Sequence, residues 1–212
     1  MITGPDFYAR PTLDVARDLL GRVLVHHTRQ GTASGRIVEV EAYIGEDDPA
    51  CHAAPGPTKR NAPMYGAPGH AYVYLNYGVH YLVNVVTEPR LSPAAVLIRA
   101  LEPLEGVDLM RCRRLRSRAS RGTKPPAPIP DAALCKGPGN VTRAMGITLD
   151  DTGIDLLGPK LYIENRGHRV DRILWSPRIG ITVGTEHCWR CYAEGHLSMS
   201  GRSPGKKFRQ IL

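Results

Sequence analysis

Residues 36–43 have the sequence RIVEVEAY, in which apolar and polar side chains alternate from Val38 onward. A period of two predicts a β-strand, because successive side chains of a strand point to opposite faces. One face, suited to a core, would hold Val38, Val40 and Ala42. The other face would hold Ile37, Glu39, Glu41 and Tyr43. Periodicity alone favours a solvated edge for this second face, while two carboxylates beside a tyrosine keep a catalytic interpretation open.

Further strand-like runs lie on either side of this stretch. Residues 22–27 precede it across a turn around Gly31, which predicts a hairpin with a longer loop. Residues 71–76 and 80–87 flank Tyr77-Gly78, a second hairpin candidate. Other apolar runs cover residues 94–100 and 179–183, and helices are predicted over residues 11–21, 104–118 and 140–145. Many short strands, few helices and no linker indicate one α+β domain over residues 1–212.

The charge balance points to a polyanionic partner. The chain has 212 residues, with 28 Lys plus Arg against 20 Asp plus Glu and a formal charge of +8. Such an excess favours nucleic acid, although basic charge alone does not identify it. The sequence has neither a run of 18 apolar residues nor a secretory leader, so we expect no membrane span and no secretion. Five scattered cysteines, an odd count, favour the reducing cytoplasm over a disulfide framework.

Tyrosines and arginines are unevenly distributed along the chain. Nine tyrosines accompany only two phenylalanines, and five of the tyrosines fall within residues 65–81. Tyrosines beside basic residues can stack on bases while the basic residues hold phosphates, although a lone tyrosine is more often packed in a core. Six arginines fall within residues 111–121. They would form either a phosphate-contacting strip or a solvated helix face.

One pattern hints at a metal. Residues 188–191 read Cys-Trp-Arg-Cys, with His187 and His196 nearby. A single CxxC without a second pair at finger spacing is a weak zinc signal, so we predict no metal site. No phosphate-binding loop or dinucleotide fingerprint is present either.

Residues 36–45, RIVEVEAYIG, resemble the signature strand of the alkyladenine (3-methyladenine) DNA glycosylase family, also called the methylpurine DNA glycosylases. The resemblance continues in order through His52, Asn84 and the runs at residues 60–66 (RNAPMYG), 68–74 (PGHAYVY), 77–80 (YGVH), 97–103 (LIRALEP) and 135–139 (CKGPG). It extends from about residue 15 to residue 147 and is patchy after that. Several long matches in order are far more specific than any single short motif.

This resemblance implies both a fold and a reaction. The fold is a single mixed domain with a curved, mainly antiparallel sheet, flanking helices and a protruding hairpin that intercalates into DNA. In the reaction, an alkylated or deaminated purine is flipped out of the duplex, and an activated water hydrolyses its N-glycosidic bond to leave an abasic site. The implied lesions are 3-methyladenine, 7-methylguanine, ethenoadenine and hypoxanthine. Because water is the nucleophile, we expect a monofunctional enzyme without a metal or organic cofactor.

The resemblance also assigns two catalytic residues. By position, Glu41 is similar to the carboxylate that activates the water for attack on the anomeric carbon. Arg99 resembles the arginine that positions this water and carboxylate. A carboxylate suits an oxocarbenium-like transition state, because it takes the proton and stabilises the developing positive charge.

The base-binding residues follow in the same way. Tyr43, His52 and Tyr74 resemble the walls that sandwich the flipped base, where aromatic faces attract a positively charged purine. His52 would also read the purine edge through a hydrogen bond. Asn84 resembles the residue that crowds the guanine amino group. Tyr77 resembles the wedge that fills the vacated stack from the minor groove and so offsets a few kcal/mol of unstacking.

The implied partner is double-stranded DNA containing damaged purines, bound by a monomer. Arg60, Lys136, Gly137 and Arg190 are the expected contacts to the DNA backbone. Residues 195–198 depart from the Gly-Ser/Asn-Pro pattern of the family, which weakens the expectation of C-terminal DNA contacts. A cytoplasmic protein is expected, associated with the nucleoid in a bacterium or located in the nucleus of a eukaryote.

Three alternatives remain at this point. The first is a helix-hairpin-helix repair module centred on residues 134–141, with a catalytic aspartate among Asp150, Asp151 and Asp155. The second is a non-enzymatic nucleic-acid-binding protein with a basic, tyrosine-rich surface. The third, a formyl-transfer or RNA-binding barrel, shares only the β-rich outline.

Overall fold

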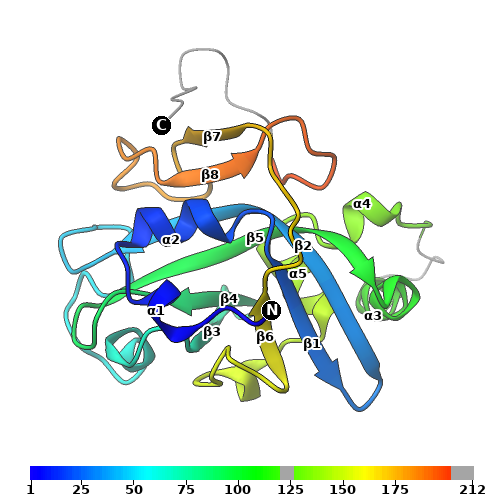
Figure 1. The fold of residues 1–212 in the computed structure, drawn as a ribbon, viewed down its shortest axis with the longest axis horizontal. Coiled ribbons are helices and arrows are strands. Elements are labelled where there is room, and N and C mark those ends of the chain that lie inside the picture. Colours follow the sequence, from blue (N-terminus) through cyan, green and yellow to red (C-terminus); the bar gives the residue numbers. More distant parts are fainter. Residues whose placement is uncertain (120–126, 202–212) are drawn as a thin grey trace.

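β2 (Gly31–Ile44) is the central strand of the structure, a computed structural model that describes residues 1–119 and 127–201. Along one edge it pairs with β5 (Ala94–Glu105). Along its other edge it pairs with β1 (Val23–Thr28) and then, from Glu39 to Glu41, with β8 (Arg190–Ala193). The sheet therefore forks at β2, where the partner strand changes (Figure 1).

The remaining strands extend this sheet in both directions. They are β3 (Ala71–Asn76), β4 (His80–Val86), β6 (Leu161–Glu164) and β7 (Ile173–Ser176). The order is β3-β4-β5-β2-β1-β6, with β7 attached through β8. Each of these strand pairs is antiparallel. The curved antiparallel sheet with few helices confirms the predicted α+β class.

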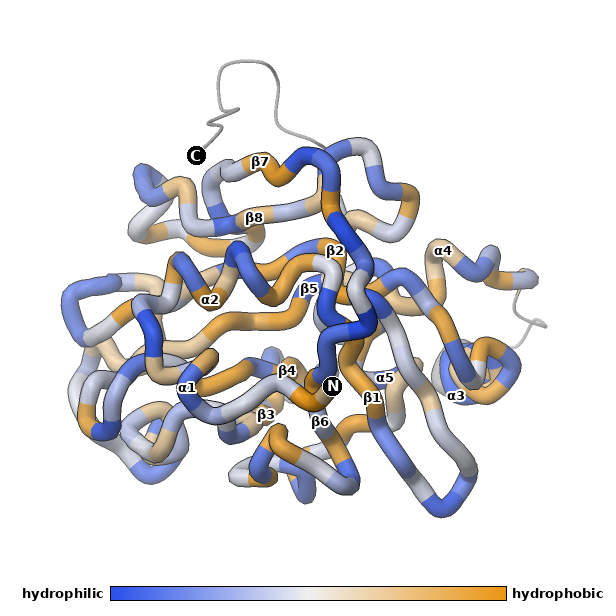
Figure 2. The backbone as a smooth tube through the Cα atoms, viewed as in Figure 1, coloured by the Kyte–Doolittle hydropathy of each residue, from blue (hydrophilic) through white to orange (hydrophobic). Residues whose placement is uncertain are grey.

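Helices pack against the sheet and close its core. α2 (Thr12–Leu19) contacts β2 and β5, and α5 (Pro138–Met145) contacts β4 and β5. The other helices are α1 (Pro5–Tyr8), α3 (Val107–Ala119) and α4 (Asp131–Leu134), and 3-10 turns cover Ala62–Tyr65 and Leu149–Asp151. Hydrophobic colour follows the central strands in Figure 2, and hydrophilic colour follows most of the connecting loops. Among the described helices, none combines the length and apolar character that crossing a bilayer requires.

The alternation predicted for residues 36–43 is interrupted. Ile37 pairs with Leu101 and Val40 with Ile98, but between them the register shifts twice, so Val38 on β2 and Arg99 on β5 lie at β-bulges. Ile37 belongs to the main core, whereas Val38 packs in a separate small cluster. The prediction that Val38 shares a face with Val40, and Ile37 with the two glutamates, was therefore wrong. A bulge leaves no mark in the hydrophobic pattern.

Three further expectations need correction. The first hairpin has a tight turn in place of a longer loop, because β2 begins at Gly31, which pairs with Thr28. Gly35 lies within that strand, and a glycine is needed there because a Cβ would lie 2.9 Å from the Cβ of Leu101 on the neighbouring strand. The predicted helix over residues 104–118 begins later, at Val107, because β5 runs on to Glu105. Residues 179–183 form a loop, and the strands nearby are β7 and β8.

Candidate active site

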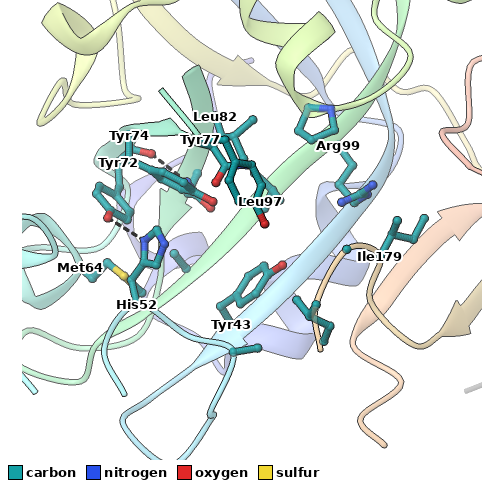
Figure 3. A pocket seen from close by; sticks show the side chains of 17 residues that line it. Tyr43, His52, Met64, Tyr72, Tyr74, Tyr77, Leu82, Leu97, Arg99 and Ile179 are labelled. Atoms are coloured by element: carbon teal, nitrogen blue, oxygen red, sulfur yellow. Dashed lines mark hydrogen bonds between the residues drawn. The ribbon is translucent and has the colours of Figure 1, made fainter. Parts of the chain in front are cut away.

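A cavity of about 410 Å³ opens between the β3–β4 hairpin, β5 and two loops (Figure 3). Its lining combines tyrosines, smaller apolar side chains and a few polar ones: Tyr43, Ala50, His52, Met64, Tyr72, Tyr74, Asn76, Tyr77, Leu82, Asn84, Ala95, Leu97, Arg99, Pro138, Ile179, Gly180 and Ile181. A cavity of this size, walled by aromatic rings with a few polar groups, suits a planar ligand such as a purine base. The catalytic and pocket residues predicted from the sequence are all in its lining, except Glu41.

An aromatic cluster forms one wall. The rings of His52 and Tyr74 meet edge to face at a centroid distance of 4.4 Å, and Tyr72 lies 5.4 Å from Tyr74. Nδ1 of His52 is 2.9 Å from the hydroxyl of Tyr72. Burial, with a smaller contribution from Arg60, lowers the pKa of His52 to about 4. The imidazole is therefore neutral near pH 7. Burial also raises the pKa of Tyr72 to about 12, so its hydroxyl stays protonated well above neutral pH.

His52 is held in place by the loop that carries it. The side-chain amide of Asn61 is buried and donates to the carbonyl oxygens of His52, at 2.7 Å, and Gly56, at 2.9 Å. The backbone N–H of Thr58 donates to Oδ1 of Asn61 at 2.6 Å. The Asn61 side chain thus adds to the backbone turns of this irregular segment and satisfies two of its carbonyl oxygens.

Glu41 lies behind the cavity wall with its side chain fully buried. Its Oε2 accepts from Nη1 of Arg99 at 3.0 Å and from the hydroxyl of Tyr43 at 2.9 Å. Its Oε1 accepts from the backbone N–H of Ile179 at 2.7 Å. A carboxylate offers about four acceptor positions. These three donors leave one position on Glu41 for a further donor such as water. The solvated edge that periodicity favoured is therefore wrong for this face.

A second buried carboxylate lies beside the first. Glu39 accepts from Nε of Arg99 at 3.2 Å, from Nε of Arg190 at 2.7 Å and from the backbone N–H of Ser200 at 2.5 Å. The negative charges of two carboxylates are thus compensated by the positive charges of two guanidinium groups in a buried site. Arg99 bridges Glu39 and Glu41, so the orientation of its guanidinium is set from both sides. Glu39 was visible on the predicted strand, but its link to Arg190 and Ser200 was not.

Asn84 has a fixed orientation in the cavity. It pairs with Tyr72 across the β3–β4 ladder and with Leu97 across the β4–β5 ladder. Its side-chain amide donates to the carbonyl oxygen of Tyr72 at 3.0 Å and is 4% exposed. The polar group is therefore presented to the cavity by a central strand and cannot swing freely.

Tyr77 stands at the tip of the β3–β4 hairpin with 86% of its surface exposed. The Val79 N–H donates to the carbonyl oxygen of Asn76 at 3.0 Å, which closes a β-turn over residues 76–79. Its two central residues have positive φ, 49° at Tyr77 and 66° at Gly78, as a type I′ turn requires. The hairpin is braced by α5, where Thr142 donates to the carbonyl oxygen of Tyr81 at 2.7 Å and Arg143 to that of Val79 at 3.2 Å. The geometry fits an exposed aromatic wedge on a supported hairpin.

The four expected DNA-backbone contacts differ in their placement. Arg60 is exposed and its guanidinium lies 5.5 Å from the centroid of the Tyr74 ring. Lys136 is exposed, and Gly137 precedes α5 with φ 97°, both next to Pro138 in the cavity lining. Arg190 is different, because it is 1% exposed and bonded to Glu39, so we withdraw it as a phosphate contact.

The arginine-rich run is largely structural where it is described. Arg113 donates to the carbonyl oxygens of Ala144 and Met145, and Arg114 is buried and donates to that of Leu134. Arg111 pairs with Asp108 through one terminal nitrogen and with Asp131 through the other. The rest of the run reaches residue 121, outside the described residues. Arg111, Arg113 and Arg114 thus join α3 to its neighbours, whereas Arg116 is exposed.

Sequence reasoning missed a buried ion pair under the cavity. Arg178 and Asp48 are both fully buried and meet at 2.6 Å and 2.8 Å. They come from loops 130 residues apart, each of which lines the cavity. Neither residue lies in a recognisable motif, so no signal in the sequence could have found the pair.

Metal-ligating residues do not gather in the described part of the chain. No three His, Cys, Asp or Glu side chains of residues 1–119 and 127–201 are grouped to hold an ion. Cys191 is fully buried in the main core, and His187 stacks on Trp189 at 4.1 Å.

The structure brings together the features that the resemblance to DNA glycosylases implies: an aromatic cavity sized for a base, a buried glutamate–arginine pair behind it and an exposed tyrosine hairpin. Comparison with known proteins agrees: the family model described as methylpurine-DNA glycosylase (MPG) matches residues 6–197. A protein of Chlorobium phaeobacteroides named "Putative 3-methyladenine DNA glycosylase" is 47% identical over 96% of this chain and 97% of its own length. One of the same name from Methanocella arvoryzae is 46% identical over 94% and 96%. The chain belongs to the methylpurine-DNA glycosylase family and is a monofunctional DNA repair glycosylase.

This membership rules out the three alternatives. A helix-hairpin-helix module is wrong because the fold is a β-sheet, in which the helices around Gly137 have four and eight residues. Asp151, one of its candidate catalysts, is buried in an ion pair with Lys160 at 2.7 Å. The non-enzymatic and formyl-transfer interpretations do not agree with a glycosylase family.

Proposed function

We propose that this enzyme flips alkylated or deaminated purines, among them 3-methyladenine, 7-methylguanine, ethenoadenine and hypoxanthine, out of double-stranded DNA. It then hydrolyses the N-glycosidic bond and leaves an abasic site. The observation that carries the proposal is the cavity wall itself, where a buried Glu41 is held by Arg99 and Tyr43 directly beside an aromatic pocket.

The hydrolytic step uses the acceptor position that remains on Glu41. A water bound there donates one proton to the carboxylate while its oxygen forms a bond to C1′ of the sugar. The C1′–N bond breaks, and its electron pair leaves with the base. The negative charge of Glu41 also stabilises the positive charge that develops on the sugar. Water is the nucleophile, so no cofactor enters the scheme.

The pocket favours a cationic base without itself carrying excess charge. Neutral His52 does not repel a positively charged purine. The hydroxyls of Tyr43 and Tyr74 are protonated at neutral pH, and burial raises their pKa further. The ring faces of Tyr43, His52 and Tyr74 then attract an alkylated base by cation–π interaction, worth about 1–2 kcal/mol in a desolvated site.

Two further residues would select among damaged bases and support base flipping. Asn84, fixed by its bond to Tyr72, would crowd the exocyclic amino group of guanine and so favour adenine-type lesions. Tyr77 would enter the duplex from the minor groove and fill the gap left by the flipped nucleotide. Arg60, Lys136 and Gly137 flank the cavity mouth and would contact the phosphates on either side.

Residues 1–212 would act as a single glycosylase domain and as a monomer. The enzyme would act on DNA in the cytoplasm, at the nucleoid of a bacterium, or in the nucleus of a eukaryote, without a membrane partner.

The test is single-turnover base release from duplexes carrying hypoxanthine, ethenoadenine or 3-methyladenine, beside an undamaged duplex. Wild type is compared with Glu41→Gln, which keeps the shape but not the charge. Glu46→Gln is the matched control, because Glu46 is an exposed carboxylate nearby that bonds only Tyr65 among the described residues. Lesion-dependent release that is lost in E41Q and kept in E46Q supports the proposal. Release that survives in E41Q refutes Glu41 as the base.

A further inference from the structure

The buried pair of Asp48 and Arg178 connects the two loops that form the cavity mouth. Asp48 lies in the loop that leads to His52, and it accepts from the backbone N–H of Ile44 at 3.3 Å and of Ala50 at 3.1 Å. Its two carboxylate oxygens meet both terminal nitrogens of Arg178. A bidentate pair of this kind fixes direction as well as distance.

Arg178 in turn fixes its own loop. Its guanidinium donates to the carbonyl oxygens of Ala42, at 3.1 Å, and Gly184, at 3.3 Å. It also lies 4.7 Å from the centroid of the Tyr43 ring and 5.0 Å from that of Trp189. The next residue is Ile179, whose backbone N–H bonds Glu41. The Ile179 N–H shares a peptide plane with the Cα of Arg178. Because the guanidinium of Arg178 is held by Asp48, Ala42 and Gly184, its side chain restrains that Cα and therefore where the N–H lies.

We infer that Asp48 and Arg178 are positioning residues for the glycosylase reaction: together they place the Ile179 N–H on Glu41 and the Tyr43 ring in the base pocket. This inference rests on the proposed role of Glu41. The pair itself touches neither the base nor the water. It sets which acceptor position of Glu41 remains open, and therefore where the nucleophilic water lies relative to C1′.

If the pair were only structural, its loss would lower the melting temperature and leave the base-release rate of the folded protein unchanged. If the pair positions the catalytic groups, its loss lowers the base-release rate of a protein that is still folded. Removing one partner leaves an unpaired buried charge and destabilises strongly, whereas neutralising both partners avoids that cost. The double variant D48N/R178M removes both charges while Asn keeps an acceptor for Ala50. Its fold is checked by thermal unfolding. Its base release is measured at single turnover with enzyme in excess, and its affinity for lesion DNA is measured separately.

We expect D48N/R178M to stay folded at the assay temperature, with a melting temperature lowered by several degrees because the carbonyl oxygens of Ala42 and Gly184 lose their donor. We expect it to bind lesion DNA within about two-fold of wild type. Its single-turnover rate falls about 100-fold, because an error of about 1 Å in the placement of reacting groups costs that much. The matched control is R36M/E102L, which removes another Arg–carboxylate pair between β2 and β5, formed at 2.7 Å on a part of these strands away from the cavity lining. It should keep the wild-type rate.

Arg178→Lys gives a second test that keeps a charge opposite Asp48. Lysine has no planar fork and cannot serve Asp48, Ala42 and Gly184 together. We expect an intermediate loss of rate at unchanged affinity. A wild-type rate in D48N/R178M, or an equal loss in R36M/E102L, overturns the positioning role. An inactive wild type would instead refute the proposed function.

Discussion

Replacing Tyr77 by asparagine should stabilise the protein and impair its proposed activity. The φ of 49° places Tyr77 in the left-handed region, which costs a residue with a bulky side chain about 1 kcal/mol. Asparagine tolerates this region, and Asn-Gly is the preferred dipeptide of a type I′ turn. Because Tyr77 is 86% exposed, its removal gives up little buried surface. We expect a gain of about 1 kcal/mol, or about 2–4 °C in melting temperature for a chain of this size.

The effect on base release has the opposite sign. Unstacking a nucleotide costs a few kcal/mol, which the wedge offsets. Loss of about 2 kcal/mol of that compensation lowers the single-turnover rate about 30-fold, at 1.36 kcal/mol for each factor of ten. Thermal unfolding and ethenoadenine release are measured on Y77N, with Y77F as the control that keeps the ring and the strain. A lower melting temperature would refute the strain argument, and an unchanged release rate would refute the wedge.

Three other variants test the site and its supports. Burial lowers the pKa of His52 from 6.5 to about 4, so protons bind first to the unfolded chain and the free energy of unfolding falls as the pH drops from 6.5 towards 4. Measured by urea unfolding at pH 7.5 and 4.5, the free energy of unfolding should fall less in H52Q than in wild type. An equal fall in both would contradict the lowered pKa. Arg190→Met removes an ion-pair partner from the buried Glu39 and should lower the free energy of unfolding by about 3 kcal/mol. The double variant E39Q/R190M should recover stability, and a failure to recover would show that the unpaired charge of Glu39 is not the cause. Gly139→Ala places a methyl 2.8 Å from the His80 ring and should cost about 1–3 kcal/mol in thermal unfolding, with relief in G139A/H80A.

Much of the sheet could be predicted because its signals are local. The alternation from Val38 onward, the Tyr-Gly turn and the β-branched runs locate β2 to β5, although β2 begins five residues earlier and β5 ends five residues later than predicted. The resemblance then placed Glu41 and Arg99 in one site, and the structure joins them at 3.0 Å. These features depend on neighbours in the chain or on motifs, so they are readable in sequence.

The rest depends on contacts between distant segments. The bulges at Val38 and Arg99 exist only as a relation between two strands, and neither strand shows an irregular pattern by itself. The burial of Glu39 requires Arg190 and Ser200, which lie more than 150 residues away in the sequence. Asp48 and Arg178 are similar, because the two residues acquire a meaning only when the loops meet.

The fork in the sheet at β2 has a consequence for how the molecule opens. From Glu39 to Glu41 the strand is paired on both edges, with β5 and with β8. Backbone amides there should exchange with solvent only when the whole protein unfolds, whereas the tip of the β3–β4 hairpin should exchange through smaller local openings. The two carboxylates would thus stay in place while the hairpin tip moves, so the protein can adapt to the DNA duplex without disturbing the groups that cleave the glycosidic bond.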